Sequence, residues 1–301
     1  MQSIQFPLTC PVCHEAMSWS RVAVACPNRH SFDIAREGYV NLYRTSRKSE
    51  NQPGDSREML VSRRRFLDTD QYAPLSDCLN QIVSRLASDA ASDSRESQRP
   101  WSILDVGCGE GYYLNRMQTH LTDRHPNVLT ERLGIDISKE AVRMAARRYK
   151  DVSWCVANAA DYIPCGNGSV DLALSVFAPR FSDLLHRVIA PEGRLVTVIP
   201  GPHHLAELTA LAMADSRDTG AKEQETIAQF RPNFDLMDQQ TVRFEMLLNM
   251  DTLWDLYRMI PVYWRSTKEA QERIRGLDGL LATAHFSVLT FRPDRPSGRP
   301  A

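Results

Sequence analysis

The stretch Ile103-Leu-Asp-Val-Gly-Cys-Gly-Glu-Gly111 decides the fold of this chain. It opens with the apolar pattern of a buried strand and continues with Gly107, Gly109 and Gly111 at alternate positions. Glycine adopts turn conformations that other residues avoid and lets the backbone approach a ligand closely. The stretch therefore predicts a strand-to-helix turn that binds a nucleotide-like cofactor. A glycine turn alone does not say which one, because nicotinamide and S-adenosylmethionine domains share it.

Strands and helices alternate on the carboxyl side of this turn. Their periods predict strands at 101–106, 132–137, 152–156, 170–176 and 194–199, and helices from the turn to about 119, at 139–149 and at 183–189. This succession predicts an α/β fold, a Rossmann-like, doubly wound and mostly parallel sheet. Beyond it we expect helical structure over 203–230, a strand at 241–248, a helix at 252–259 and a strand at 286–291, which would close the sheet in antiparallel fashion.

Polar residues at the ends of these strands favour one of the two cofactors. Asp105 begins the glycine turn and can face the ammonium group of S-adenosylmethionine, directly or through water. Asp136 ends the second strand, where a carboxylate suits both ribose hydroxyls, and Asn158 follows the third, where it can read the adenine edge. Simpler explanations exist for single residues, Asp136 as a helix cap and Asn158 as a turn residue. Together these residues favour a class I methyltransferase over a dehydrogenase.

A second constellation lies near the amino terminus, where Cys10-Pro-Val-Cys13 is followed after twelve residues by Cys26 and His30. Zinc favours four tetrahedral nitrogen and sulfur ligands, and two thiolates separated by two residues can share one ion on a tight turn. His14 is a competing ligand, but it would crowd the first turn. The alternative of merely reduced core cysteines is the weaker one, given two well-spaced pairs. We expect a structural zinc site in a small zinc-ribbon-like module, with no open position for catalysis.

The composition of the 301-residue chain is that of a soluble globular protein, with 43% hydrophobic and 24% charged residues and a formal net charge of −1. The near-neutral total argues against a wholly basic nucleic-acid coat protein but is compatible with a local basic patch. We expect no membrane association, because no stretch approaches the ~20 apolar residues that span a bilayer and the first residues lack a secretory pattern. Seven cysteines without framework spacing favour a reducing cytoplasm.

Three parts are expected along the chain: a zinc-binding module at 1–43, a linker with a basic helix at 44–71, and the methyltransferase domain at 72–301. The module would hold strands at 20–25 and 30–33, and residues 45–55 are polar and lack periodicity, as linkers do. A helix starting near Tyr72 would precede a polar, serine-rich surface loop at 87–100.

The expected helix at 56–67 is strongly basic. It belongs to a concentration of positive charge made of Arg36, Arg44, Arg47, Lys48, Arg57, Arg63, Arg64 and Arg65. A solvated helix face is the simplest explanation of such a run. Beside a zinc module, contact with RNA phosphates is the alternative.

Several segments together resemble the RlmA (RrmA) family of bacterial 23S rRNA (guanine-N1)-methyltransferases. The resemblance covers nearly the whole chain and lies in residues 10–13, 26–42, 54–59, 63–67, 72–75, 104–113 and 200–205. It implies zinc at the four cysteine and histidine positions given above. It also implies S-adenosylmethionine contacts from Tyr72, from the Gly109–Glu110–Gly111 turn and from His204.

For function, the resemblance implies methylation of N1 of one guanine in a 23S rRNA hairpin by an enzyme that can be homodimeric. Two branches of the family choose neighbouring guanines, and these motifs do not decide between them. Two other classes stay open: a zinc-bearing methyltransferase for a protein or small molecule, and a non-catalytic module that binds RNA or senses S-adenosylmethionine.

The target pocket is expected directly after the fourth strand. Phe177 and Arg180 stand where many base methyltransferases shape that pocket, and we expect one of them to stack on or orient the guanine. The simpler alternative is a buried phenylalanine and a surface arginine. Guanine N1 must lose a proton during transfer, and no residue identifies itself as the base.

Overall fold

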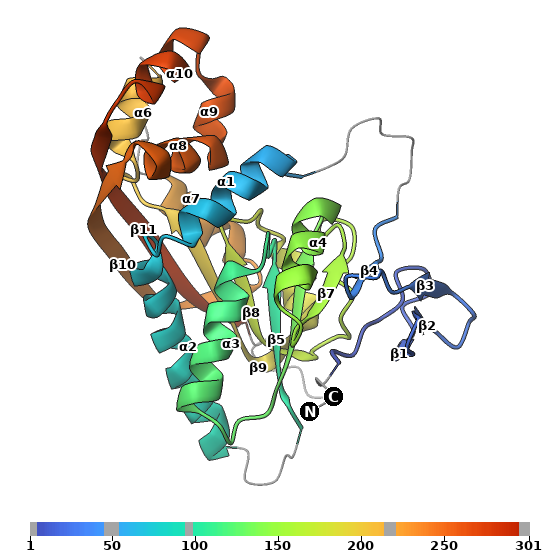
Figure 1. Ribbon diagram of the computed structural model, residues 1–301. Coiled ribbons are helices and arrows are strands. Elements are labelled where there is room, and N and C mark those ends of the chain that lie inside the picture. The colour runs from blue at the N-terminus through green and yellow to red at the C-terminus, as the bar shows by residue number, and fades with distance from the viewer. Residues whose placement is uncertain (1–4, 45–53, 94–98, 214–220, 295–301) are drawn as a thin grey trace.

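The computed structural model describes residues 5–44, 54–93, 99–213 and 221–294 (Figure 1). Its centre is an eight-stranded sheet in the order β10-β11-β9-β8-β5-β6-β7-β4. These strands are β4 Tyr39–Asn41, β5 Trp101–Val106, β6 Thr130–Asp136, β7 Ser153–Val156, β8 Val170–Val176, β9 Ile189–Pro200, β10 Phe234–Asn249 and β11 Gly279–Pro293. Strands β4 to β9 pair in parallel, whereas β11 pairs antiparallel with both β9 and β10. The predicted mostly parallel sheet with an antiparallel closure is confirmed.

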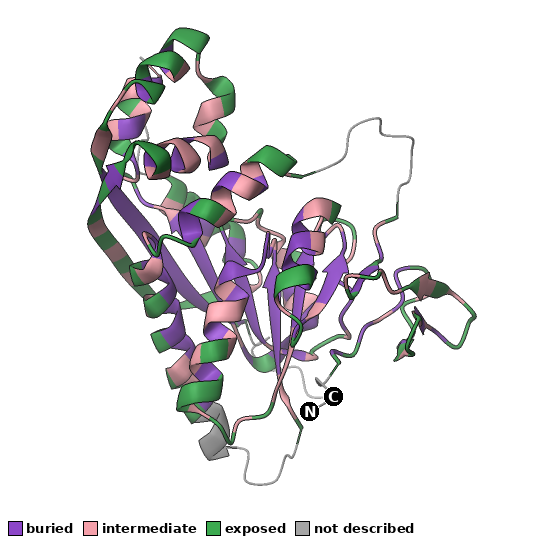
Figure 2. Ribbon diagram, in the orientation of Figure 1, coloured by how far each residue is buried: buried purple, intermediate pink, exposed green. Residues whose placement is uncertain are grey.

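Helices cover both faces of this sheet. One face carries α2 (Ala73–Asp93), α3 (Tyr112–Arg124) and α4 (Lys139–Arg148), and the other carries α5 (Ser182–Val188) and α7 (Ala221–Phe230). Successive residues of a strand point to opposite faces, so Ile103 packs in the first core and Leu104 in the second. Figure 2 shows the parallel strands as the buried layer between the helices.

The remaining helices lie beyond the carboxyl ends of the parallel strands and around one end of the β10–β11 hairpin (Figure 1). They are α1 (Arg57–Leu67), α6 (Ala206–Ala212), α8 (Met250–Met259), α9 (Pro261–Arg265) and α10 (Lys268–Arg275). Helix α1 packs against α8, and the Arg258 side chain of α8 pairs with Glu58 at 3.0 Å. This packing places α1 over the end of β5, where the glycine turn begins.

The amino-terminal segment forms a small antiparallel sheet of β1 (Ser18–Trp19), β2 (Ala23–Ala25) and β3 (Ser31–Asp33). The next strand, β4, leaves this sheet and extends the large one, with Val40 opposite Cys155 of β7. Phe6 and Leu8 are fully buried in the core that also holds Leu104. The metal-binding segment therefore shares a hydrophobic core with the large domain, and the boundary at residue 43 stays a prediction.

Several expectations about single elements differ from the structure, and strands β9 and β11 both begin earlier than expected, at Ile189 and Gly279. The expectation of a surface loop starting at residue 87 is wrong, because α2 continues to Asp93. Alanine has a high intrinsic helix propensity, so this alanine-rich stretch is helical although it lacks an apolar stripe. The helical region expected at 203–230 consists of α6 and α7, and residues 214–220 lie outside the described part. Strand β10 begins earlier than expected because it pairs with β11 along nearly its whole length. In the described residues no helix has the length and apolarity to cross a bilayer.

Candidate functional site

The glycine turn connects the end of β5 to α3. Gly107, Gly109 and Gly111 have φ angles of +74°, +56° and +89°, in the left-handed region that favours glycine. A Cβ atom on Gly107 would lie 2.6 Å from the Cβ atom of Ala178, so a larger residue there would displace the loop that follows β8. The turn thus offers bare backbone to whatever binds at this edge of the sheet.

Asp136 ends β6 and reaches across to the turn. Its Oδ2 accepts a hydrogen bond from the Gly109 N–H at 2.9 Å, and its Oδ1 accepts one from the Ser138 N–H at 2.8 Å. Burial raises the pKa of this carboxyl, and the two hydrogen bonds oppose that rise. Ser138 itself caps α4 by accepting from the Ala141 N–H. Asp136 therefore orders the turn, and each of its oxygens keeps capacity to accept from a hydroxyl group.

Several buried polar atoms beside the turn lack a hydrogen-bond partner within the described residues, among them Oδ1 of Asp105 and the hydroxyl of Tyr113. Asp105 is only 2% exposed, and burial, reinforced by the charge of Asp136, raises the pKa of its carboxyl to about 7. Buried polar groups nearly always find a partner, so the pair indicates a place for a polar ligand. The ammonium group of S-adenosylmethionine fits this carboxylate, and its ribose hydroxyls fit Asp136.

Asn158 follows β7, on the side of Asp136 away from the turn. Its Oδ1 accepts from the Ala160 N–H at 3.1 Å, and its Nδ2 donates to Asp161 at 2.7 Å. These contacts are those of a turn residue, the simpler of the two explanations. Contact with an adenine edge stays a prediction for this residue, and the turn it stabilises would form that wall of the site.

An aromatic cluster of Tyr72, His204 and Phe286 lies on the side of the glycine turn opposite Asn158. The Tyr72 hydroxyl, at the start of α2, lies 3.4 Å from Nε2 of His204, and both rings pack on Phe286 of β11, at centroid distances of 5.1 and 4.6 Å. Nδ1 of His204 accepts from the backbone N–H of His285 at 3.3 Å, so the proton of the neutral ring sits on Nε2 and donates to Tyr72. The two residues expected to contact the cofactor, far apart in sequence, are thus brought together.

The structure separates the two candidates for the target pocket. Phe177 has a φ angle of +56° and a side chain that is 42% exposed, and its ring packs on Tyr113 and Phe286. A phenylalanine held in this conformation is strained, and such strain persists mainly at functional sites. Arg180 instead donates a hydrogen bond to Thr226 of α7. The geometry favours Phe177 as the residue open to an incoming base.

The predicted metal ligands Cys10, Cys13, Cys26 and His30 converge, with all four ligand atoms within 4.8 Å of one another. The Sγ atoms of Cys13 and Cys26 lie 3.6 Å apart, and Nδ1 of His30 lies 3.4 Å from the Cys26 sulfur and 3.6 Å from the Cys10 sulfur. A tetrahedral zinc ion with Zn–S bonds of about 2.3 Å requires separations of about 3.8 Å between sulfurs and about 3.5 Å from sulfur to nitrogen. The four residues therefore fit zinc. His14 stacks on Tyr162 instead, at 4.7 Å.

This metal cluster is joined to the segment that follows Asn158. The Thr9 N–H donates to the Pro164 carbonyl at 3.0 Å, and the Thr9 hydroxyl lies 2.6 Å from that of Tyr162. Together with the His14–Tyr162 stack, these contacts tie the first cysteine turn to the expected adenine wall. The metal site is thus packed against the segment that follows Asn158.

The arginine side chains of the basic helix α1 are paired with carboxylates. Each of its four arginines has an acidic partner: Arg57 with Glu140 (3.7 Å), Arg63 with Asp55 (2.5 Å), Arg64 with Glu110 (3.2 Å) and Arg65 with Asp255 (3.6 Å). These pairs weaken the expectation that the helix contacts RNA phosphates. In the same basic group, Arg44 donates to the Pro11 carbonyl, Arg36 is exposed, and Arg47 and Lys48 lie outside the described residues.

The Arg64–Glu110 pair places the Glu110 side chain toward α1, since its carboxylate is 2% exposed and meets Arg64 there. Burial raises the pKa of Glu110, while Arg64 opposes the rise. Of the predicted cofactor residues, Glu110 thus contributes its backbone to the turn and its side chain to the contact between α1 and the turn.

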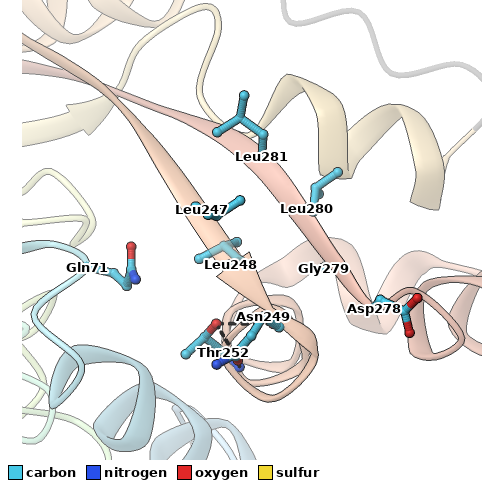
Figure 3. A pocket seen from close by; sticks show the side chains of 9 residues that line it. All are labelled: Gln71, Leu247, Leu248, Asn249, Thr252, Asp278, Gly279, Leu280 and Leu281. Carbon is cyan, nitrogen blue, oxygen red and sulfur yellow. Dashed lines mark hydrogen bonds between the residues drawn. The ribbon is translucent and has the colours of Figure 1, made fainter.

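A shallow hollow of about 540 Å³ lies away from these residues, beside Gln71, at the junction of β10, β11 and α8 (Figure 3). Its walls include Leu247 and Leu281, paired across the two strands and 79% and 52% exposed. Neither the glycine turn nor Phe177 borders it. The unpartnered atoms of Asp105 and Tyr113 lie instead at the carboxyl end of β5 and the start of α3.

Sequence reasoning missed Tyr113, the Asp55–Arg63 pair and the role of Arg64. Tyr113 lies two residues after the last glycine, where a side chain can turn back to the cofactor, so its position was a usable signal. No local pattern links Arg64 to Glu110, because the pairing depends on how α1 docks. The only hint was a glutamate inside a glycine turn, where burial requires a cationic partner.

Comparison with known proteins gives family models for both parts of the chain. Residues 8–49 match a zinc-ribbon model described as RlmA, N-terminal, and residues 103–193 match a model described as Methyltransferase domain. The first range contains all four metal ligands. The second contains Asp105, the glycine turn, Asp136 and Phe177.

Full-length relatives are also found. The 23S rRNA (guanine(748)-N(1))-methyltransferase of Streptomyces fradiae is 35% identical over 275 residues, which cover 91% of each chain. A Micromonospora griseorubida protein, provisionally named a 23S rRNA (guanine-N(1)-)-methyltransferase, is 30% identical over 95% of this chain and 97% of its own. A malonyl-[acyl-carrier protein] O-methyltransferase of Dechloromonas aromatica is 31% identical over only 40% of this chain. The similarity to the rRNA enzymes therefore includes the metal-binding segment and α1.

Proposed function

The chain belongs to the RlmA family of 23S rRNA (guanine-N1)-methyltransferases, and we propose that it transfers the methyl group of S-adenosylmethionine to N1 of a guanine in 23S rRNA. The observation that carries this proposal is similarity to the Streptomyces fradiae enzyme over 91% of both chains. A methyltransferase domain alone would fit many substrates. The zinc ribbon, which occurs in the RlmA model, narrows the substrate to ribosomal RNA.

S-adenosylmethionine supplies a methyl group on a sulfonium, and this chain's residues hold and orient the molecule. The Asp105 carboxylate faces its ammonium group, Asp136 accepts from the ribose hydroxyls, and the backbone of the glycine turn lies along it. Tyr72 and His204 form the wall on the α2 side. The unpartnered Oδ1 of Asp105 and the open acceptor capacity of Asp136 support these assignments.

Phe177 stacks on the target guanine and thereby sets the position of N1 beside the cofactor. Its exposure, its strained backbone and its contact with Tyr113 support this role. A base taken out of an RNA loop is commonly held on an aromatic ring. Placement of the two reacting atoms supplies much of the rate of such a transfer.

The zinc ribbon has a structural ion and helps to hold the RNA. The substrate is a hairpin of 23S rRNA, the enzyme acts in the cytoplasm, and two copies form a homodimer.

Exposure of Leu247 and Leu281 on paired strands supports a further protein contact at the hollow in Figure 3. Sedimentation of the protein alone, compared with a Leu281→Lys variant, tests the dimer, since a charge there would disrupt a buried apolar contact.

Primer extension on 23S rRNA tests the activity, because a methyl group on N1 blocks Watson–Crick pairing and stops the polymerase. Cells lacking the protein should lose one stop, and the cloned chain should restore it at a defined guanine. A stop that persists in the deletion strain would reject the proposal. If rRNA is unmodified but purified protein binds S-adenosylhomocysteine, a protein or small-molecule substrate or a non-catalytic module becomes the better explanation.

Phe177→Ala tests the stacking role in vitro, with Leu129→Ala as a control for an exposed apolar residue at the other end of the sheet. Stacking of a base on an aromatic ring contributes about 1–3 kcal/mol, so we expect kcat/KM for RNA to fall roughly 5- to 150-fold. The Kd for S-adenosylhomocysteine should stay within about twofold, and Phe177→Tyr should retain activity. Full activity of Phe177→Ala with loss of activity in Arg180→Ala would transfer the role to Arg180.

A further inference from the structure

Among the arginines of α1, Arg63 extends toward the backbone of the glycine turn. Its Nη1 is 2.5 Å from Oδ2 of Asp55 and 3.6 Å from the point where a Cβ atom on Gly109 would stand. The guanidinium therefore lies directly over the bare backbone of the turn. Its side chain is 27% exposed, so one edge remains accessible to a ligand.

The segment that holds Asp55 is itself fixed against the cofactor site. Gly54 has a φ angle of +93°, and a Cβ atom there would lie 2.7 Å from the Cβ atom of Ser138. The Ser138 hydroxyl donates to the Asp55 carbonyl at 3.5 Å. Ser138 also bonds to Asp136, so the start of α1, the first turn of α4 and the ribose-binding carboxylate form one connected group.

The charges at this edge are unequal. The Arg63 guanidinium pairs with Asp55 and acts on the charge of Asp136, and the charge of Asp136 in turn acts on the buried Asp105, so three carboxylates gather around one arginine. The other arginines of α1 are turned elsewhere: Arg57 and Arg65 are 78% and 60% exposed and pair with α4 and α8, and Arg64 is held by Glu110.

S-adenosylmethionine has both an ammonium and a carboxylate at its methionine end. Asp105 accounts for the ammonium, but a carboxylate among three acidic side chains requires a cation. Resting on the function proposed above, we propose that Arg63 binds the carboxylate of S-adenosylmethionine, and that Asp55 holds the guanidinium in position for it. Arginine suits this task because its planar fork donates two parallel hydrogen bonds to a carboxylate.

The assignment extends the role of α1 from packing to recognition. Helix α1 lies before residue 72, where the methyltransferase domain is expected to begin. By docking on the glycine turn, it would complete the cofactor site from outside that domain. Asp55 is a positioning residue in this scheme, since it touches the guanidinium and not the cofactor.

Calorimetric titration of the full-length, zinc-loaded protein tests the proposal with S-adenosylhomocysteine and its decarboxylated analogue. The wild type should bind S-adenosylhomocysteine at least about 10-fold more tightly, because one charge-assisted contact is lost in the analogue. Arg63→Gln should weaken S-adenosylhomocysteine about 10- to 100-fold and change the analogue less than about threefold. Arg63→Lys should recover part of the affinity for S-adenosylhomocysteine alone, and Arg57→Gln should change neither.

Equal wild-type affinities for the two compounds would overturn the role of Arg63 while leaving the proposed function intact, and this comparison needs no variant. Equal weakening of both compounds by Arg63→Gln would overturn it as well, because it would show a structural effect. Asp55→Asn should selectively weaken S-adenosylhomocysteine by a few-fold, and a matched loss for both compounds would reject its positioning role. Binding of neither compound by the wild type would overturn both proposals.

Discussion

Replacing Asp105 with Asn should stabilise the cofactor-free protein while removing its affinity for the cofactor. The carboxyl group is 2% exposed, its Oδ1 has no partner within the described residues, and burial raises its pKa from 3.8 to about 7. At about 1.4 kcal/mol for each pKa unit, ionisation of this group costs the folded state about 4 kcal/mol relative to the unfolded chain. An unpartnered buried amide costs about 1–3 kcal/mol in its place. The net gain for Asp105→Asn is therefore about 1–3 kcal/mol at alkaline pH.

The sign of the pH dependence follows from proton binding. Between pH 3.8 and about 7 the folded protein holds a proton on Asp105 that the unfolded chain has lost. The free energy of unfolding contributed by this group therefore falls as pH rises through that window, and the full penalty applies above it. Asparagine does not titrate, so the advantage of the variant should grow by about 1 kcal/mol from near pH 6 to near pH 8.5.

Urea unfolding of both zinc-loaded proteins at these two pH values measures the difference. The zinc site is the same in both proteins, so its contribution cancels when the two curves are compared. Calorimetry with S-adenosylhomocysteine measures the accompanying loss of affinity, which we expect to exceed about 100-fold because a charged partner is removed from a buried contact. A variant less stable than the wild type near pH 8.5, or an advantage that does not change with pH, would refute the reasoning.

Three further outcomes are expected. Arg64→Gln should lower the free energy of unfolding by about 3–5 kcal/mol, because it leaves the buried Glu110 carboxylate unpaired; chemical denaturation measures this, and Glu110→Gln in the same chain should restore part of the loss. Gly134→Ala should cost about 1–3 kcal/mol or more, because its Cβ atom would stand 2.2 Å from Trp154; an unchanged Tm would contradict this. Chelating zinc should lower the Tm and weaken S-adenosylhomocysteine binding, through the contacts at Tyr162; unchanged affinity in the metal-free protein would reject that coupling.

The metal cluster shows what local spacing can predict. Two cysteines separated by two residues on a tight turn lie near each other, and a second pair of ligands, Cys26 and His30, completes the four that one zinc ion favours. The expected set of four was therefore accessible from the sequence, and the structure brings those side chains together. The position of strand β4 was not accessible, because its pairing with β7 depends on a partner more than a hundred residues away.

Some residues around the glycine turn could likewise be placed from the sequence, and others only from the structure. Asp105 and Asp136 end neighbouring strands of a parallel sheet, and such ends meet at one edge, so periodicity was enough to place them together. Tyr72 and His204 were expected from family resemblance, and only the packing of both rings on Phe286 gives their proximity a cause. Between Phe177 and Arg180 the sequence offered no choice. The contact of Arg180 with α7 and the exposure of Phe177 favour Phe177, whose role stays a prediction.

The sequence by itself determined the parallel sheet, the cofactor turn and the four metal ligands, because each depends on residues that are neighbours along the chain or at the ends of adjacent strands. Only the tertiary structure decided what the arginines of α1 do. In sequence they are a run of positive charge. In the fold Arg57, Arg64 and Arg65 each meet an acid from a distant segment, and Arg63 meets Asp55 just before the helix. Charge partners are selected by the docking of whole elements, which buries apolar faces far larger than any single ion pair. That docking places Arg63 over the glycine turn at 107–111.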